Sequence, residues 1–309
     1  MIDTSRLETV ACYFCTSGHN EIWTEENGFT VCKCTGCGLL YVNPRPRLSD
    51  ISDAAKTGLH EGAEVQNAIG SYWPYTKPGF KRRVRDMFPE LDFRSPFSWL
   101  DVGCGYGEFL ESVSELSAGK GKVRGCEPSA PKLQSARDRG LDVSFFRLAD
   151  HADRYDYVSM LNVYSHLPDP TETLSEIRSL LKPGGELLLQ TGDVTGLRRE
   201  DFPYNLGLPG HLSFAPEAVL RGLLQRAGFS VVSVKKYYYN TIERSLSAII
   251  AGDLWRFVRG QGTLDRIKLL PQARRDMCGC APVSNDWLLL SILSFQRLVE
   301  HRIFKGGDA

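Results

Sequence analysis

The sequence predicts an α/β protein built on a doubly wound, mostly parallel sheet. Between residues 97 and 240, apolar strand-like runs alternate with amphipathic helix-like runs, as in a sheet with helices on both faces. A glycine-rich turn follows the first strand, and two Cys-x-x-Cys pairs lie near the start of the chain. We therefore expect a small zinc-ribbon module at 1–48, a helical cap or linker at 49–96, a Rossmann-like domain at 97–240 and a mainly helical C-terminal extension at 241–309.

The glycine-rich turn, LDVGCGYG, spans residues 100–107. Phe97–Leu100 leads into it as a buried strand, and Glu108–Leu116 leaves it with apolar residues at helical spacing. Glycines without a Cβ let backbone N–H groups approach a ligand, and the following helix offers its positive end. The turn is therefore expected to bind a nucleotide-type cofactor through Asp101, Gly103, Cys104, Gly105 and Gly107.

Glycine spacing separates two cofactor classes. A dinucleotide fingerprint, G-x-G-x-x-G, counted from Gly103 would need its third glycine at position 108, where the sequence has glutamate. The third glycine is instead Gly107, and Asp101 precedes the turn. This D-x-G-x-G-x-G pattern resembles the first motif of class I S-adenosylmethionine (SAM) methyltransferases. The resemblance implies that Glu127, followed by Pro128, accepts the ribose hydroxyls of the cofactor with its two carboxylate oxygens.

The segments that follow keep to the same family pattern. The resemblance covers about residues 97–240 and implies that the cofactor lies across the carboxyl ends of the strands. The last strand of the family, normally a short antiparallel partner of the sixth, is not found after Tyr239. The expected elements are a strand at 155–163, its exit loop at 164–170, a helix at 171–181, a proline-glycine stop at 182–185, a strand at 186–190, a helix from Pro216 to Ala227 and a strand at 230–239.

Two Cys-x-x-Cys pairs, separated by eighteen residues, predict a zinc site at the start of the chain. Four thiolates give zinc a closed tetrahedral site without room for substrate or water, so the zinc would be structural. Cys32 is an alternative to one cysteine of the second pair, and His19 is a weaker substitute. Unligated thiols are the other interpretation. The expected ligands are Cys12, Cys15, Cys34 and Cys37.

The region between the cysteines and the sheet adds to the resemblance. An apolar strand from Gly38 ends in Asn-Pro-Arg-Pro at 43–46, which resembles bacterial methyltransferases of natural-product, sugar and surface-polysaccharide pathways that carry an N-terminal zinc module. The aromatic rings of Ser71–Tyr75 would either close over the cofactor or acceptor or pack in the core. A basic cluster at 81–85 is interpreted as the solvated face of a helix.

The C-terminal extension favours helices, above all over Asp286–Arg302. It would cover the site, pair subunits or pack as an extension of the sheet. Cys278 and Cys280 form a C-x-C pair, which alone is a weak signal. The broad apolar face of the predicted helix consists of Trp287, Leu288, Ile292, Leu293, Phe295, Leu298 and Val299.

Charge and composition limit the kinds of substrate and the cellular location that we expect. The chain has 37 Lys and Arg residues and 37 Asp and Glu residues, and so lacks the basic surplus typical of a nucleic-acid modifier. No basic and apolar leader begins the sequence, and no run of eighteen apolar residues occurs in it. We expect a cytoplasmic protein outside the membrane that acts on a small-molecule acceptor and not on nucleic acid. Oligomerisation through the C-terminal helices is left open.

Methyl transfer to a hydroxyl needs a base near the methyl group. Two histidines, His166 and His211, lie on predicted loops at the carboxyl edge of the sheet, and a neutral imidazole suits the role. His211 is the preferred base because it lies in the variable acceptor loop. His166 is either a second candidate or a structural histidine that shapes the cofactor pocket. The residues expected to orient His211 or contact sugar hydroxyls are Asp193, Asp201 and Tyr204.

Two further residues complete the predicted cofactor site. Asp150 is expected to accept a hydrogen bond from the adenine amino group, and Asn162 to line the methionine end. The resemblance thus implies a SAM-dependent methyltransferase with a structural zinc, acting on a hydroxyl of a sugar-bearing or phosphorylated metabolite. The alternatives are an RNA methyltransferase that recognises its substrate through the zinc ribbon, and a non-catalytic assembly module.

Overall fold

The computed structural model describes residues 2–61, 65–66, 70–193, 199, 205–238 and 297–305. The chain divides into two compact units, one of Met1–Lys236 with Val299–Ala309 and one of Tyr237–Leu298. Almost all of the second unit falls outside the described residues. Within the described part of the chain, no helix is both long enough and apolar enough to cross a membrane.

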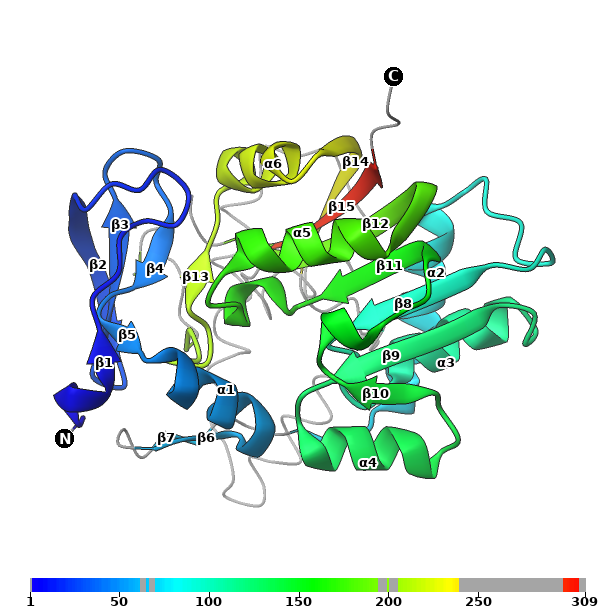
Figure 1. Ribbon diagram of the computed structural model, residues 1–309, viewed down its shortest axis with the longest axis horizontal. Helices are drawn as coiled ribbons and strands as arrows, with labels where there is room; N and C mark the ends of the chain where they lie inside the picture. The colour runs from blue at the N-terminus through cyan, green and yellow to red at the C-terminus, as the bar shows by residue number, and fades with distance from the viewer. Residues whose placement is uncertain are drawn as a thin grey trace, which may run out of the picture. The chain divides into compact units, whose positions relative to one another are not determined.

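A seven-stranded sheet is the centre of the first unit (Figure 1). The four neighbouring pairs from β10 to β12 are parallel, which confirms the predicted mostly parallel α/β sheet. Chain order reverses at β8, and open α/β sheets bind ligands at such a switch point. In spatial order the strands are β10 (Val143–Phe145), β9 (Lys122–Glu127), β8 (Ser98–Val102), β11 (Tyr155–Leu161), β12 (Leu181–Asp193), β15 (Arg297–Lys305) and β14 (Phe229–Tyr238).

Consecutive strand residues are buried on opposite faces of the sheet, as a doubly wound fold requires. On one face the fully buried Trp99 belongs to a cluster with Val84 of α2 and Phe109 of α3. On the other face Leu100 belongs to a cluster that includes Leu174 of α5 and residues of α6. The helices are α2 (Lys77–Met87), α3 (Glu108–Leu116), α4 (Ala130–Asp138), α5 (Pro170–Leu180) and α6 (Glu217–Arg226).

A second sheet, of four antiparallel strands, is built mainly from N-terminal residues. Two of its strands form a hairpin whose turn residues, Asn27 and Gly28, have φ values of 53° and 80°. Positive φ at both turn positions is the type I′ geometry that favours Asn-Gly. The fourth strand, β13, comes from the chain between β12 and α6. In spatial order the strands are β13 (Ser213–Phe214), β4 (Leu40–Val42), β3 (Phe29–Cys34) and β2 (Asn20–Glu26).

The remaining elements are short. The segment expected to be a helical cap contains a two-stranded hairpin, β6–β7, between two helices. The 3-10 helices are η1 (Thr4–Arg6), η2 (Pro74–Thr76), η3 (Leu148–Asp150) and η4 (Tyr164–His166). The other elements are β1 (Leu7–Glu8), β5 (Arg45–Pro46), α1 (Leu48–Thr57), β6 (Leu59–His60) and β7 (Val65–Gln66).

The C-terminal prediction needs a correction. The helix expected over 286–302 is wrong at its carboxyl end, because Arg297–Lys305 form strand β15 between β12 and β14. This is the strand that could not be found directly after Tyr239. A short apolar run fits either periodicity, and pairing with neighbouring strands decides between them. The rest of the predicted extension, including Cys278 and Cys280, lies outside the described residues, and its role in subunit pairing stays a prediction.

Candidate functional site

Three strand ends meet where the order of the sheet reverses. Asp101 of β8 is in register with Gly125 of β9 on one side and with Ser159 of β11 on the other. Because the three strands are parallel, their carboxyl ends lie at the same edge of the sheet. The glycine turn after β8, Glu127 at the end of β9 and Asn162 after β11 therefore share this edge.

The glycine turn has a backbone that only glycine adopts readily. Gly103, Gly105 and Gly107 have φ values of 70°, 58° and 90°. A Cβ on Gly103 would lie 2.3 Å from Cγ2 of Val163, whereas a Cβ on Gly105 would meet no atom within 4 Å. Gly103 is thus required for packing. The backbone at Gly105 is open to a ligand, directly before the N-terminus of α3.

Asp101 is buried beneath this turn, with 2% of its surface exposed. Its Oδ1 accepts a hydrogen bond of 2.5 Å from Ser159 Oγ, which in turn accepts one of 2.9 Å from Trp99 Nε1. Burial, with a smaller contribution from the nearby Glu127 charge, raises the pKa of Asp101 to about 7, although the hydrogen bond from Ser159 opposes the effect. The carboxyl is therefore poised to ionise when a cationic group arrives. The spacing of the glycine motif gave no signal for Ser159, which contacts Asp101 from another strand.

Glu127 is the second buried acid, with 4% of its surface exposed. Its oxygens accept hydrogen bonds of 2.9 Å from Gly105 N and 3.0 Å from Ser129 N. Burial raises the pKa of Glu127, while these two backbone donors lower it. Each carboxylate oxygen can accept a further hydrogen bond, so the pair can bind two hydroxyls. Pro128 follows β9 and is half-buried beside Glu127.

The thiol of Cys104 points into the protein rather than toward a ligand. Cys104 is buried, and its Sγ lies 2.7 Å from where a Cβ on Gly125 would stand. Its backbone N–H, like that of Gly103, donates to the carbonyl of Cys126. Cys104 therefore fixes the turn against β9.

Asn162 lies at the carboxyl end of β11 in the left-handed region, with φ of 59°. Its Oδ1 accepts a hydrogen bond of 3.1 Å from Gln190 Nε2, and Gln190 Oε1 accepts one of 3.0 Å from Arg83 Nη1. The buried Gln190 thereby orients the exposed Asn162 amide. Asp150 ends η3, and its side chain is 64% exposed, 3.8 Å from Arg147. An adenine contact for Asp150 stays a prediction.

The two predicted histidines lie together. The ring centroids of His166, in η4, and His211 are 4.4 Å apart. The Nδ1–H of His166 donates to Gly210 O at 2.6 Å, and the Nδ1–H of His211 donates to Leu206 O at 2.5 Å. In both rings Nε2 is left as the acceptor.

The surrounding protein lowers the pKa of both imidazoles and so favours their neutral forms. Burial lowers the pKa of His211, although the bond to Leu206 O and the charge of Glu26 oppose the effect. The pKa of His166 is also lowered, by the surrounding protein and by His211, although His166 keeps solvent-exposed surface. Of the residues expected beside His211, Asp201 and Tyr204 lie outside the described residues, as does the side chain of Asp193.

The aromatic segment before α2 is anchored to α3. Tyr72 Oη donates to Glu111 Oε2 at 2.5 Å, and the Arg139 guanidinium stacks 3.9 Å from the Tyr72 ring. The rings of Trp73 and Tyr75 stack on each other 5.6 Å apart and are about half exposed. The exposure of the stacked pair contradicts core packing for these two rings, and closure over the cofactor or acceptor stays a prediction.

The four predicted zinc ligands converge. The sulfurs of Cys12, Cys15, Cys34 and Cys37 all lie within 4.8 Å of one another, and none of these residues forms a disulfide. Four thiolates at such distances suit a tetrahedral zinc ion. The Ser17 backbone lowers the pKa of Cys15 to about 7, which favours a thiolate there. Cys32 is not part of the cluster, since its Sγ faces Asn43 O at 3.6 Å. His19 is not in it either.

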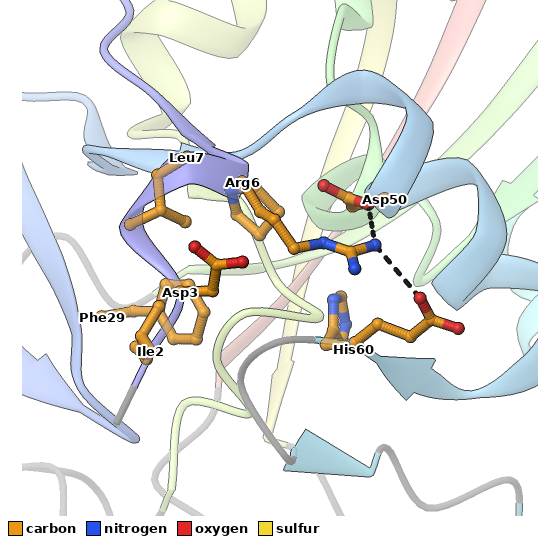
Figure 2. A pocket seen from close by; sticks show the side chains of 9 residues that line it. Ile2, Asp3, Arg6, Leu7, Phe29, Asp50 and His60 are labelled. Atoms are coloured by element: carbon orange, nitrogen blue, oxygen red, sulfur yellow. Dashed lines mark hydrogen bonds and ion pairs between the residues drawn. The ribbon is translucent and has the colours of Figure 1, made fainter.

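Two cavities among the described residues differ in volume and therefore in the ligands they could bind. The first lies around Arg6, whose Nη2 is 2.5 Å from Asp50 Oδ1 and 3.2 Å from Glu61 Oε2 (Figure 2). Its volume of about 10 Å³ admits one water molecule at most. The second, of about 320 Å³, is lined by residues adjacent in sequence to both histidines, Leu167 and Leu212. That volume is in the range of small-molecule pockets.

Comparison with known proteins shows similarity to methyltransferases. Residues 72–234, somewhat more than half of the chain, match a family model described as a methyltransferase domain. The ubiquinone biosynthesis O-methyltransferase of Salmonella enteritidis is 34% identical over 104 residues, covering 31% of this chain and 43% of that enzyme. Its counterpart from Erwinia tasmaniensis is 35% identical over 102 residues, covering 30% of this chain and 41% of the relative.

The similarity to these relatives is partial. The chain spans less than half the length of the curated relatives it matches. Among solved structures, a cyclopropane synthase from Mycobacterium tuberculosis superposes with a TM-score of 0.48 at 14% identity, covering 72% of this chain and 83% of that one.

Proposed function

Because the chain belongs to the methyltransferase family, we propose that it transfers a methyl group from SAM to a hydroxyl of a small molecule that bears a sugar or a phosphate. The observation that carries this proposal is the meeting of Asp101, the glycine turn and Glu127 at one edge of the sheet. Relatives that methylate oxygen, matched over about a third of the chain, support the hydroxyl.

The residues at this edge fit SAM. The open backbone at Gly105 allows close approach of a ligand. Asp101 would attract the cationic amino group of the methionine part, and Glu127 would accept the ribose hydroxyls. Asp150 would contact the adenine, and Asn162 the methionine end. When bound, SAM supplies an electrophilic methyl group on a sulfonium, so the protein needs only to align the acceptor and remove its proton.

His211 is proposed as the base. Its Nδ1–H is occupied by Leu206 O, and its lowered pKa keeps Nε2 unprotonated near neutral pH. As the acceptor oxygen forms its bond to the methyl carbon and the carbon–sulfur bond breaks, the hydroxyl proton would pass to Nε2 and then to solvent. The sulfur keeps the electron pair of the broken bond and leaves as a neutral thioether. His166 would hold the ring of His211 in place.

The four clustered cysteines are proposed to hold a structural zinc. A closed set of four thiolates leaves no position for a substrate, so the zinc would stabilise the N-terminal module and take no part in the chemistry.

A small acceptor is favoured over RNA. The zero net charge offers no basic surplus for phosphodiester contacts.

Calorimetric titration with SAM and with S-adenosylhomocysteine tests the cofactor. Binding should occur in the wild type and fall at least tenfold in Asp101→Ala and Glu127→Ala. A folded, zinc-loaded wild type that binds neither ligand would support the assembly-module alternative. Transfer of radioactive methyl to nucleotide-linked sugars, with structured RNA as the competing substrate, then tests the acceptor. Labelling of RNA alone would overturn the small-molecule proposal.

A further inference from the structure

Glu26 joins the hairpin of the N-terminal sheet to the segment that carries His211. It is the last residue of β2, and its side chain is only 9% exposed. Its Oε2 accepts a hydrogen bond of 2.7 Å from Leu206 N, and its Oε1 accepts bonds of 2.8 Å from Gly207 N and 3.1 Å from Leu208 N. Hydrogen bonds to an ionised acceptor are stronger than neutral ones, so one carboxylate fixes three successive peptide units.

One of these peptide units connects Glu26 to His211. The N–H of Gly207 and the C=O of Leu206 belong to the same peptide group, and that C=O accepts the Nδ1–H of His211 at 2.5 Å. A carboxylate that accepts a hydrogen bond from an amide N–H polarises the amide group. The carbonyl oxygen of that amide then becomes a stronger hydrogen-bond acceptor. The chain from carboxylate to imidazole is therefore continuous, with a single peptide between the two side chains.

His166 provides the internal comparison. Its Nδ1–H also donates to a carbonyl, that of Gly210. The N–H of the same peptide group belongs to His211 and donates to the neutral carbonyl of Gly207. The two imidazoles thus have similar direct partners, but a single peptide separates His211 from Glu26, whereas the path from His166 reaches Glu26 only through a second peptide, Gly207–Leu208.

We infer that Glu26 is a positioning residue that acts through the Leu206–Gly207 peptide and holds His211 in its Nδ1–H tautomer, with Nε2 directed to the reaction. The inference rests on the proposed function, in which His211 removes the acceptor proton. A base whose second nitrogen is oriented by another group is the usual arrangement for proton transfer. Here that group comes from the N-terminal sheet, which links the cysteine module to the chemistry.

Other groups also surround this contact. Arg199 Nη2 forms a long ion pair of 3.8 Å with Oε2, whereas the three backbone N–H groups lie nearer to the carboxylate, at 2.7 to 3.1 Å. Asn27 Nδ2 donates to Leu208 O at 2.7 Å, which gives the segment a second, neutral anchor. Around the imidazole are His166 and the ring of Phe214, whose centroid is 5.9 Å away.

The tautomer can be measured directly. The chain has six histidines, so nitrogen-15 NMR of histidine-labelled protein at about pH 8 is practicable, with His211→Asn to assign the signal. The wild type should show His211 protonated at Nδ1. In Glu26→Gln the Nε2–H tautomer should become populated, and kcat should fall about 10- to 100-fold while the KM for SAM stays unchanged.

Two control variants separate this role from general stabilisation. Glu25→Gln neutralises the preceding residue of the same strand, which is exposed. Asn27→Gly removes the neutral anchor and keeps a residue suited to the turn. Neither should change the tautomer. An unchanged tautomer in folded Glu26→Gln, an equal change in Asn27→Gly, or wild-type His211 protonated at Nε2 would each overturn the inference.

The NMR result does not depend on turnover. If the protein binds no SAM, the proposed function is refuted. A change of the His211 tautomer in Glu26→Gln would still support the positioning contact in that case. Methyl transfer with wild-type kcat in Glu26→Gln would refute the inference alone. If Glu26→Gln does not fold, wild-type His211 protonated at Nε2 would still overturn the inference.

Discussion

Replacing Asp101 by asparagine should stabilise the protein without ligand and weaken SAM binding. The carboxyl has a pKa of about 7 in the fold against 3.8 as the ordinary value, chiefly because it is buried. A raised pKa means that its contribution to stability is full below about pH 3.8 and is lost as the pH rises through about 7. Asparagine keeps an oxygen for the Ser159 hydroxyl and carries no charge at any pH.

The magnitude follows from the pKa. Each pK unit corresponds to about 1.36 kcal/mol, so raising the pH from about 5 to about 8 should cost the wild type about 3 kcal/mol relative to Asp101→Asn. Any cost of leaving the new amide N–H groups without partners is independent of pH and cancels from this difference.

Urea denaturation of both proteins at the two pH values measures the effect, and calorimetry measures SAM affinity, which should fall more than tenfold. Asp86→Asn, an exposed substitution on α2, is the matched control and should change the free energy of unfolding by less than about 0.5 kcal/mol at either pH. A stability difference that stays constant between the two pH values would refute the assignment of a buried, neutral carboxyl to Asp101.

Other perturbations test the remaining features. Cys34→Ser should abolish zinc measured by mass spectrometry and lower the melting temperature, whereas Cys32→Ser should keep one equivalent of zinc; zinc retained in Cys34→Ser would refute the ligand set. Gly103→Ala should destabilise the protein by about 2–4 kcal/mol in urea titrations, and Val163→Ala should recover part of the loss, because the added Cβ would lie 2.3 Å from the Val163 side chain. His211→Ala should lower turnover about 10²- to 10⁴-fold with SAM affinity unchanged. Because burial lowers the pKa of His211, wild-type kcat should hold below pH 6.5 before it declines, and full activity in His211→Ala would refute its role as the base.

Features whose chemistry is local could be predicted from the sequence. Glycines at every second position, 103, 105 and 107, indicate a backbone conformation that few other residues adopt. Two Cys-x-x-Cys pairs fix the spacing of the metal ligands within single turns. The α3 helix has the predicted bounds, Glu108–Leu116. The four cysteine sulfurs do cluster. Whether these groups bind SAM and zinc stays a prediction.

Contacts between distant segments could not be predicted. Ser159 reaches Asp101, Gln190 orients Asn162, and Glu26 contacts the chain some 180 positions later. Each is a polar residue in or next to a strand, where its type alone gives no signal. The strand β15 was missed for a related reason, since residues 297–302, the part of it that the predicted helix covered, fit a helical pattern until their neighbours in the sheet are known.

The position of β15 has a consequence for folding during synthesis. β15 lies between β12 and β14, although β14 leaves the ribosome long before it. Until residues 297–305 emerge, β14 lacks its neighbour and one edge of β12 is unpaired. Exposed strand edges favour association with other chains, and closing a long connection adds an entropic cost. A nascent chain stalled before residue 297 should therefore depend on chaperones more than the finished protein does.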